Sequence, residues 1–164
     1  MTATTINNNN RRKLDLLDCQ LPERDTSNIR SILKANNMPF YVPDPKEAHG
    51  YMFNCWGFVA RNFGWEERLR WVDTWQMEHH LAEHTITIEA DEASVGDIAV
   101  FRRPNGALTH TALVTHDLEI ICHKPGSGQL CVDTLTTACS IYGTVSYVRP
   151  KDSKLIEEKV EETR

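Results

Sequence analysis

A cysteine that directly follows a helix-capping residue is the first candidate for chemistry in this sequence. Residues 50–59 read GYMFNCWGFV. Asn54 is a good N-cap and predicts a helix to about Phe63, with Cys55 in its first turn. Unpaired backbone N–H groups and the helix dipole stabilise a thiolate there, and the same groups can hold an oxyanion. The segment therefore indicates that Cys55 is a nucleophile, although a buried structural cysteine fits the same pattern. Gly57 leaves room beside it for a second backbone or a substrate.

Two histidines on predicted strands are candidates for the proton transfers that such a thiol needs. His110 opens the strand 108–115 after a Pro-Asn-Gly turn, and His123 ends the strand 118–123. A neutral imidazole within hydrogen-bond reach of a thiol takes its proton and later returns it to the leaving amine. If these strands pair as a hairpin, His123 lies near His110 and fixes its tautomer. Strand parity decides whether the rings share a face, and either histidine alone also fits a surface or core position.

The periodicity of the chain changes from helical to strand-like halfway along. Helices are expected from Thr26 or Ser27 to Asn37, from Asn54 or Cys55 to Phe63, and from Glu66 to His84. Strands are expected at 85–89, 97–102, 108–115, 118–123, 130–134 and 141–149. This order predicts an α+β fold with N-terminal helices packed on a mainly antiparallel sheet of five to six strands.

Length and composition indicate one domain with polar ends. The chain has 164 residues, of which 40% are hydrophobic and 25% charged, enough for a single core. Residues 1–12 are expected to form a disordered leader, 13–150 the folded domain and 151–164 a charged tail.

Charge, hydropathy and cysteine usage exclude several classes of protein. The net charge of −5 argues against a general nucleic-acid binder. No apolar run reaches the roughly 18 residues of a membrane span, and no signal-peptide pattern is present. We therefore expect cytoplasmic synthesis, with action there or release by phage lysis or a non-classical route. Five cysteines without zinc-ribbon spacing favour free thiols in a reducing compartment, and no metal or cofactor is predicted.

Four segments together resemble the NlpC/P60 family of papain-like cysteine peptidases. GYMFNCWGFV resembles the family's G-x-x-x-D-C-S-G-L-V nucleophile segment, and residues 94–101 look like its GD-L-V-F-F strand. Residues 110–114 are similar to its H-V-G-I-Y strand, and residues 121–126 to its I-H-A-P segment. The resemblance runs from about residue 39 to 148 and implies a papain-like fold of the NlpC/P60 type.

The resemblance also implies an activity and a set of roles. Cys55 would be the nucleophile, His110 the base and His123 the orienting residue of a Cys-His-His triad. A tyrosine near the oxyanion is usual in the family, and Tyr41 is our choice, with Tyr51 behind it. The family cleaves amide bonds in bacterial cell-wall peptides, so the expected partner is a peptide or muropeptide, with neither nucleic acid nor membrane involved.

The chain departs from the family beside the cysteine. Asn54 replaces the usual Asp, Trp56 replaces Ser or Ala, and the family's Gly-Gly stretch is missing. These neighbours help to shape the family's substrate cleft. Asn54, Trp56 and Tyr51 are therefore expected to contact the substrate. The departures from the family are expected to change which substrate is bound more than the reaction that Cys55 performs.

Two other functions fit parts of the sequence. His80, Glu83 and His84 match the H-x-x-E-H pattern of inverzincin metallopeptidases, with Glu157 or Glu161 as a distant third ligand. A polar helix end explains the same residues. Alternatively, the domain is a non-catalytic binding module that uses Trp65, Trp71 and Trp75 as a flat surface, although aromatic residues of a helix commonly pack into the core.

Overall fold

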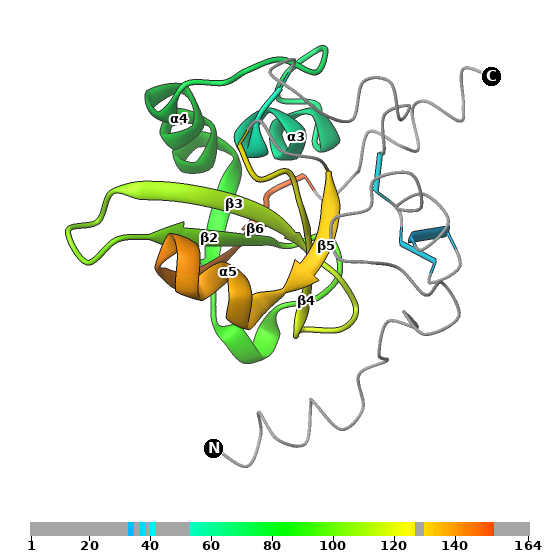
Figure 1. Cartoon of the computed structure of the whole chain (residues 1–164). Coiled ribbons are helices and arrows are strands. Elements are labelled where there is room, and N and C mark those ends of the chain that lie inside the picture. The colour runs from blue at the N-terminus through cyan, green and yellow to red at the C-terminus, as the bar shows by residue number, and fades with distance from the viewer. Residues whose placement is uncertain (1–32, 35–36, 39, 42–52, 127–129, 153–164) are drawn as a thin grey trace.

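A six-stranded sheet forms the centre of the computed structural model, which describes residues 33–34, 37–38, 40–41, 53–126 and 130–152 (Figure 1). Its spatial order is β1-β6-β2-β3-β4-β5, and all neighbouring strands are antiparallel. The predicted α+β class with an antiparallel sheet is confirmed. The strands are β1 (Thr85–Ile88), β2 (Ile98–Arg102), β3 (Leu108–Val114), β4 (Ile120–His123), β5 (Cys131–Thr134) and β6 (Thr144–Pro150).

Both faces of the central strands are buried, and they belong to two separate cores. Ile98 and Val100 of β2 belong to one apolar cluster, whereas Ala99 and Phe101 belong to the other. Side chains alternate between the faces of a strand with a period of two. Because both faces of β2 are covered, residues 98–101 form a continuous apolar run. The sheet is therefore the middle of three layers.

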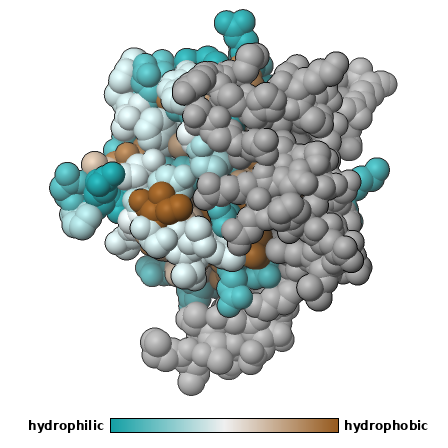
Figure 2. All heavy atoms as spheres, in the orientation of Figure 1, coloured by the Kyte–Doolittle hydropathy of each residue, from teal (hydrophilic) through white to brown (hydrophobic). Residues whose placement is uncertain are grey.

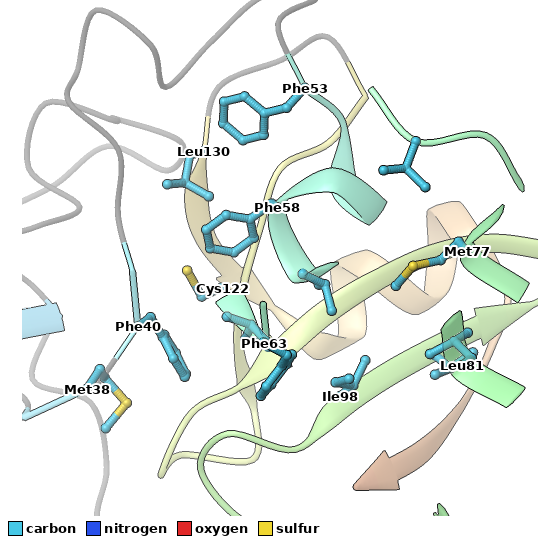
Figure 3. Close-up of a cluster of buried hydrophobic side chains, with 14 of the residues drawn as sticks. Met38, Phe40, Phe53, Phe58, Phe63, Met77, Leu81, Ile98, Cys122 and Leu130 are labelled. Atoms are coloured by element: carbon cyan, nitrogen blue, oxygen red, sulfur yellow. The ribbon is translucent and has the colours of Figure 1, made fainter. Parts of the chain in front are cut away.

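Helices α3 (Cys55–Asn62) and α4 (Thr74–His84) cover one face of the sheet. Figure 3 shows the cluster that joins them to it. The cluster includes side chains from both helices and from three strands, among them Phe58, Met77, Leu81, Ile98, Leu113 and Cys122. This layer fixes where the amino end of α3, and with it Cys55, meets the sheet.

Helix α5 (Leu135–Tyr142) lies against the opposite face, and our sequence analysis did not predict it. The strand expected from residue 141 begins instead at Thr144. Thr134 caps the helix, since its hydroxyl accepts a hydrogen bond from the Thr137 N–H. Gly143 ends the helix with a φ of 119°. The β-branched residues had favoured a strand, but the cap at one end and the glycine at the other define a helix.

The helix predicted from Glu66 to His84 was too long at its amino end. Residues 66–73 are bends and irregular chain, and α4 begins only at Thr74. Asp73 and Gln76 form a capping box that fixes this start. Of the helix predicted to end at Asn37, Leu33 and Lys34 are helical, and the rest lies mostly outside the described residues, as do the predicted leader and residues 153–164 of the tail. No described helix has the length and apolar character needed to cross a membrane.

Candidate active site

Cys55 is the first residue of α3, as predicted. Its side chain is only 5% exposed. Asn54 caps the helix through its side-chain oxygen, which accepts hydrogen bonds from the N–H groups of Gly57 and Val72 at 2.9 and 3.1 Å. The Asn54 amide donates in turn to the Val72 carbonyl at 2.8 Å. Both ends of this amide therefore bond to the protein, and the expected contact between Asn54 and substrate stays a prediction.

Gly57 is needed for the approach of another backbone. A Cβ at this position would lie 1.9 Å from the Arg70 carbonyl oxygen. The irregular segment before α4 consequently packs directly on the first turn of α3. Of the two roles predicted for this glycine, the structure supports close approach of a second backbone.

The Cys55 thiol is neutral in the resting protein. Burial is the largest influence and raises its pKa from 9.0 to about 12. The backbone N–H groups of Thr111, Trp56 and Cys55 act in the opposite direction, as does the positive charge of Lys124. Desolvation outweighs these groups and the helix dipole. The prediction of a stabilised thiolate is therefore wrong for the resting state, although the N–H groups that would hold an anion are at the sulfur.

Lys124 is a buried lysine that the sequence analysis missed. It has no exposed surface, donates to the Gly126 carbonyl at 2.7 Å, and its ammonium lies 4.8 Å from the centre of the Phe53 ring. Burial lowers its pKa to about 8, although interaction with Cys55 opposes that shift. Its position directly after His123 carries no signal of burial in the sequence, because lysines are almost always exposed.

A chain of buried polar side chains crosses β3, β4 and β5. His110 Nε2 and His123 Nδ1 are 2.7 Å apart, and His123 Nε2 lies 3.4 Å from Asp133 Oδ2. All three residues are buried. The predicted proximity of His110 and His123 on one face is confirmed. Asp133 of β5 extends the chain, and it was not among the predicted site residues.

His110 lies on the face of the sheet that carries α5. Its ring stacks on Tyr142 of α5, with 3.9 Å between ring centroids and 8° between ring planes. The ring centroid of Phe101, which belongs to the apolar cluster on the same face, lies 5.6 Å away. Burial and the neighbouring His123 lower its pKa well below 6.5. The helix that packs on His110 is therefore α5, and not α3, which bears Cys55.

Cys55 and His110 approach the same part of β3 from different sides. The Cys55 sulfur contacts the N–H of Thr111, the residue after His110, from the layer of α3. Strands β3 and β4 pair only through Leu113 and Val114, so the first half of β3 is not paired with β4. Within the described residues, no hydrogen bond joins the thiol to the His110 ring. The structure thus brings the two histidines together and places the thiol next to them without the direct bond that was expected.

The predicted site residues Tyr41, Tyr51 and Trp56 differ in where the structure places them. Tyr41 exchanges hydrogen bonds with Asn62 at the carboxyl end of α3, and Arg61 lies over its ring. These contacts are at the other end of the helix from Cys55, so the structure does not bring Tyr41 to the sulfur. Tyr51 lies outside the described residues. Trp56 is half-buried, and its indole N–H is enclosed without a hydrogen-bond partner, which leaves it as a candidate donor to substrate.

The histidines of α4 form polar and stacking contacts. His80 Nε2 lies 2.7 Å from Glu66, and His84 stacks on Trp65. Glu83 pairs with His79 at 2.9 Å. Among the described residues, the only group of three or more potential ligands is on β4 and β5, and Glu157 and Glu161 are not described. The metallopeptidase hypothesis therefore has no third ligand in this part of the chain.

Aromatic side chains near α4 are largely outside the core. Trp75 is 70% exposed and Trp71 is 40% exposed, whereas Trp65 is partly buried against the core. The expectation that such aromatics pack inward is wrong for Trp71 and Trp75. On the other side of the molecule, Ile141 of α5 is also exposed, and Figure 2 shows a compact hydrophobic area over that helix.

A scan against models of known protein families gave no match, and neither did a search of curated proteins.

Proposed function

We propose that this protein is a cysteine hydrolase of the papain-like NlpC/P60 type that cleaves an amide bond, with a cell-wall peptide as the substrate. One observation carries the proposal: the Cys55 sulfur lies against the N–H of Thr111, and the adjacent His110 is held by a buried hydrogen-bonded chain. A nucleophile, a base and an orienting group behind the base are the parts that such chemistry requires.

The chain behind His110 favours the tautomer that a base needs. Asp133 Oδ2 faces His123 Nε2, and a carboxylate attracts the proton to that nitrogen. His123 Nδ1 then accepts a hydrogen bond from His110 Nε2–H. The Nδ1 atom of His110 is left without a proton and is the atom that receives one from the thiol. Asp133 and His123 are thus positioning residues in the proposed reaction.

Substrate binding must bring the thiol within reach of His110 Nδ1. Catalytic hydrogen bonds are often long in free enzymes and tighten when substrate binds. The thiol proton moves to His110 as sulfur attacks the carbonyl carbon, and the N–H groups at the sulfur hold the oxyanion. Collapse breaks the C–N bond, and His110 returns the proton to the leaving amine. Water then hydrolyses the thioester and regenerates the thiol.

The experiment is digestion of purified peptidoglycan and defined muropeptides, with released fragments identified by mass. Wild-type protein is expected to release peptides with new amine and carboxyl ends. Cys55→Ala should release none, whereas Cys139→Ala, which changes a half-buried cysteine of α5, should match wild type. Undiminished cleavage by Cys55→Ala, or failure of the wild type to cleave any amide in the panel, would overturn the proposal.

The exposed tryptophans favour a second function, which is binding without cleavage. Large aromatic side chains in water are typical of recognition surfaces, and Trp75 is 70% exposed. If the domain is a binding module, Cys55→Ala should retain wild-type affinity for muropeptides, Trp75→Ala should weaken it, and neither variant nor wild type should release fragments.

A further inference from the structure

Three potential metal ligands converge on the face of the sheet that carries α5. His123 and Cys131 are directly paired across β4 and β5. Asp133 is two residues along β5 and therefore points to the same face. The ligand atoms of the three side chains all lie within 4.8 Å of one another. The site combines a thiol, an imidazole and a carboxylate, a donor set that suits zinc.

The distance between His123 and Asp133 fits a shared ion better than a direct hydrogen bond. Their facing atoms are 3.4 Å apart, whereas a charge-assisted hydrogen bond is about 2.7–2.9 Å long. Two ligand atoms that are each about 2.1 Å from a tetrahedral zinc ion lie about 3.4 Å from one another. His123 Nε2 is enclosed without a hydrogen-bond partner in a side chain that is 1% exposed. This nitrogen is the independent indication that the site takes a ligand.

The surroundings already provide the outer contacts of a metal centre. His110 Nε2 bonds His123 Nδ1 and fixes the orientation of the ring, as second-shell groups do for metal-bound histidines. Asp133 Oδ1 accepts the N–H of Thr134 at 2.9 Å, which leaves Oδ2 directed toward His123. The site also buries a carboxylate, and a bound cation would offset the cost of that burial.

We propose that His123 Nε2, Cys131 Sγ and Asp133 Oδ2 bind one zinc ion, with its fourth position open to water or another small ligand. Binding releases the Cys131 thiol proton to solvent. The site shares His123 and Asp133 with the proposed hydrolase but does not require Cys55, so metal binding can be tested without any hydrolase activity.

Zinc at this site opposes hydrolysis, and this consequence does rest on the proposed function. A histidine that binds zinc through Nε2 carries its proton on Nδ1. His123 would then donate to His110 Nε2, and neutral His110 would keep its own proton on Nδ1. That is the nitrogen that must accept the thiol proton. Zinc is therefore expected to act as an inhibitor by reversing two tautomers, without contacting Cys55.

Metal binding is tested with Co²⁺ as a spectroscopic probe of the full-length reduced protein. We expect one equivalent of Co²⁺ to give tetrahedral visible bands and a sulfur-to-cobalt charge-transfer band, and Zn²⁺ to displace them. Cys131→Ser should lose the charge-transfer band, whereas Cys139→Ser and Cys55→Ala should keep it. His110→Ala should weaken affinity by about 10- to 100-fold, as the loss of a second-shell contact does elsewhere.

Two further measurements keep the test decisive if Cys131→Ser does not fold. In wild-type protein, Zn²⁺ should slow alkylation of Cys131, read by peptide mass mapping, and should leave alkylation of Cys139 unchanged. Asp133→Asn should lose that protection. Absence of the cobalt bands, or bands that vanish in Cys55→Ala and persist in Cys131→Ser, would overturn the site. Metal binding without effect on cleavage would retain the site and remove only the inhibitory role.

Discussion

The two faces of the sheet are covered by helices in different ways. The face under α3 and α4 is filled by large apolar side chains such as Phe58, Met77 and Leu113. The face under α5 carries small residues, including Ala99 and Ala112. On this second face lie the buried polar groups of His110, His123 and Asp133.

This difference separates the tasks that the proposed reaction needs. The apolar face holds the amino end of α3 against β3 and desolvates the Cys55 thiol. The other face surrounds the two histidines with the rings of Phe101 and Tyr142, which limits the orientations available to the imidazoles. The nucleophile and the base are thus held by separate cores, and each can be altered without repacking the other.

After removal of the nucleophile itself, the largest effect is expected from the base on the α5 face. His110→Ala should lower kcat/KM for amide cleavage by roughly 10²–10⁴-fold, the usual contribution of a general base. His123→Ala should lower kcat/KM less than His110→Ala does, because water can partly replace an orienting group. Both values follow from steady-state kinetics on a defined muropeptide, with circular dichroism as the control for folding. Wild-type activity in His110→Ala would show that the proton acceptor is another group.

Two glycines offer a comparison of packing on the two sides. A Cβ at Gly57 would lie 1.9 Å from the Arg70 carbonyl oxygen, and one at Gly143 would lie 2.4 Å from that of Arg102. Gly57→Ala should lower the free energy of unfolding by about 1–3 kcal/mol, as overpacking does. Gly143→Ala should lower the free energy of unfolding further, because the φ of 119° at this position adds backbone strain.

Gly106→Ala is the matched control for these variants. Gly106 has a φ of 88° and no heavy atom within 4 Å of an added Cβ, so its substitution measures backbone strain alone. Urea unfolding of the three variants gives the values. A loss in Gly57→Ala no greater than that in Gly106→Ala would show that the segment before α4 moves away from α3 at little cost.

Much of the fold could be predicted from the sequence because its signals are local. The alternation of apolar residues identified all six strands to within a few residues, and Asn54 identified the start of α3. The helix α5 was missed because its sequence, LTTACSIY, has strand propensity and is decided by a cap and by packing. The start of α4 was missed because apolar residues before Asp73 continued the helical pattern.

The site was less predictable because it depends on contacts across the sheet. The expected pairing of their strands correctly predicted that His110 and His123 lie close together. It did not show that α5 would cover their face, or that burial would outweigh the helix amino end at Cys55. Asp133 and Lys124 were missed because charged residues are rarely buried, and a single sequence does not show which ones are.

The raised pKa of Cys55 predicts a dependence of stability on pH. The unfolded thiol ionises near pH 9.0, whereas the folded thiol ionises near 12. The folded state therefore holds this proton more tightly, and stability is lost as pH rises above 9. At pH 10, about one unit above the pKa of the unfolded thiol, the loss from this group is on the order of 1 kcal/mol.

Comparison with Cys55→Ala isolates that contribution from other titrating groups. The decrease in unfolding free energy between pH 8 and pH 10 should be smaller in the variant by on the order of 1 kcal/mol. Cys139→Ala, at a half-buried position, should change the decrease less. Identical pH profiles for wild type and Cys55→Ala would mean that the folded thiol ionises at its ordinary pKa. The conclusion that burial keeps the resting thiol neutral would then be wrong.

The smallest effect is expected from the ion pair that joins α4 to the sheet. Arg102 donates two hydrogen bonds to Glu78 at 2.7 and 2.8 Å, but both side chains are more than a third exposed. Exposed pairs contribute up to about 1 kcal/mol, so Glu78→Gln should lower the unfolding free energy by no more than that at neutral pH. Arg102 lowers the pKa of Glu78 below 4.5, so the contribution is present above pH 4.5 and is lost as pH falls through the lowered pKa.

Salt distinguishes this pair from the buried chain on the other face. Raising ionic strength should reduce the difference between wild type and Glu78→Gln, because exposed charges are screened. The effect of Asp133→Asn on unfolding should change little with salt, because Asp133 is buried. If both variants respond equally to salt, the Asp133 carboxylate is accessible to water, and the α5 face is more open than the packing of Tyr142 on His110 implies.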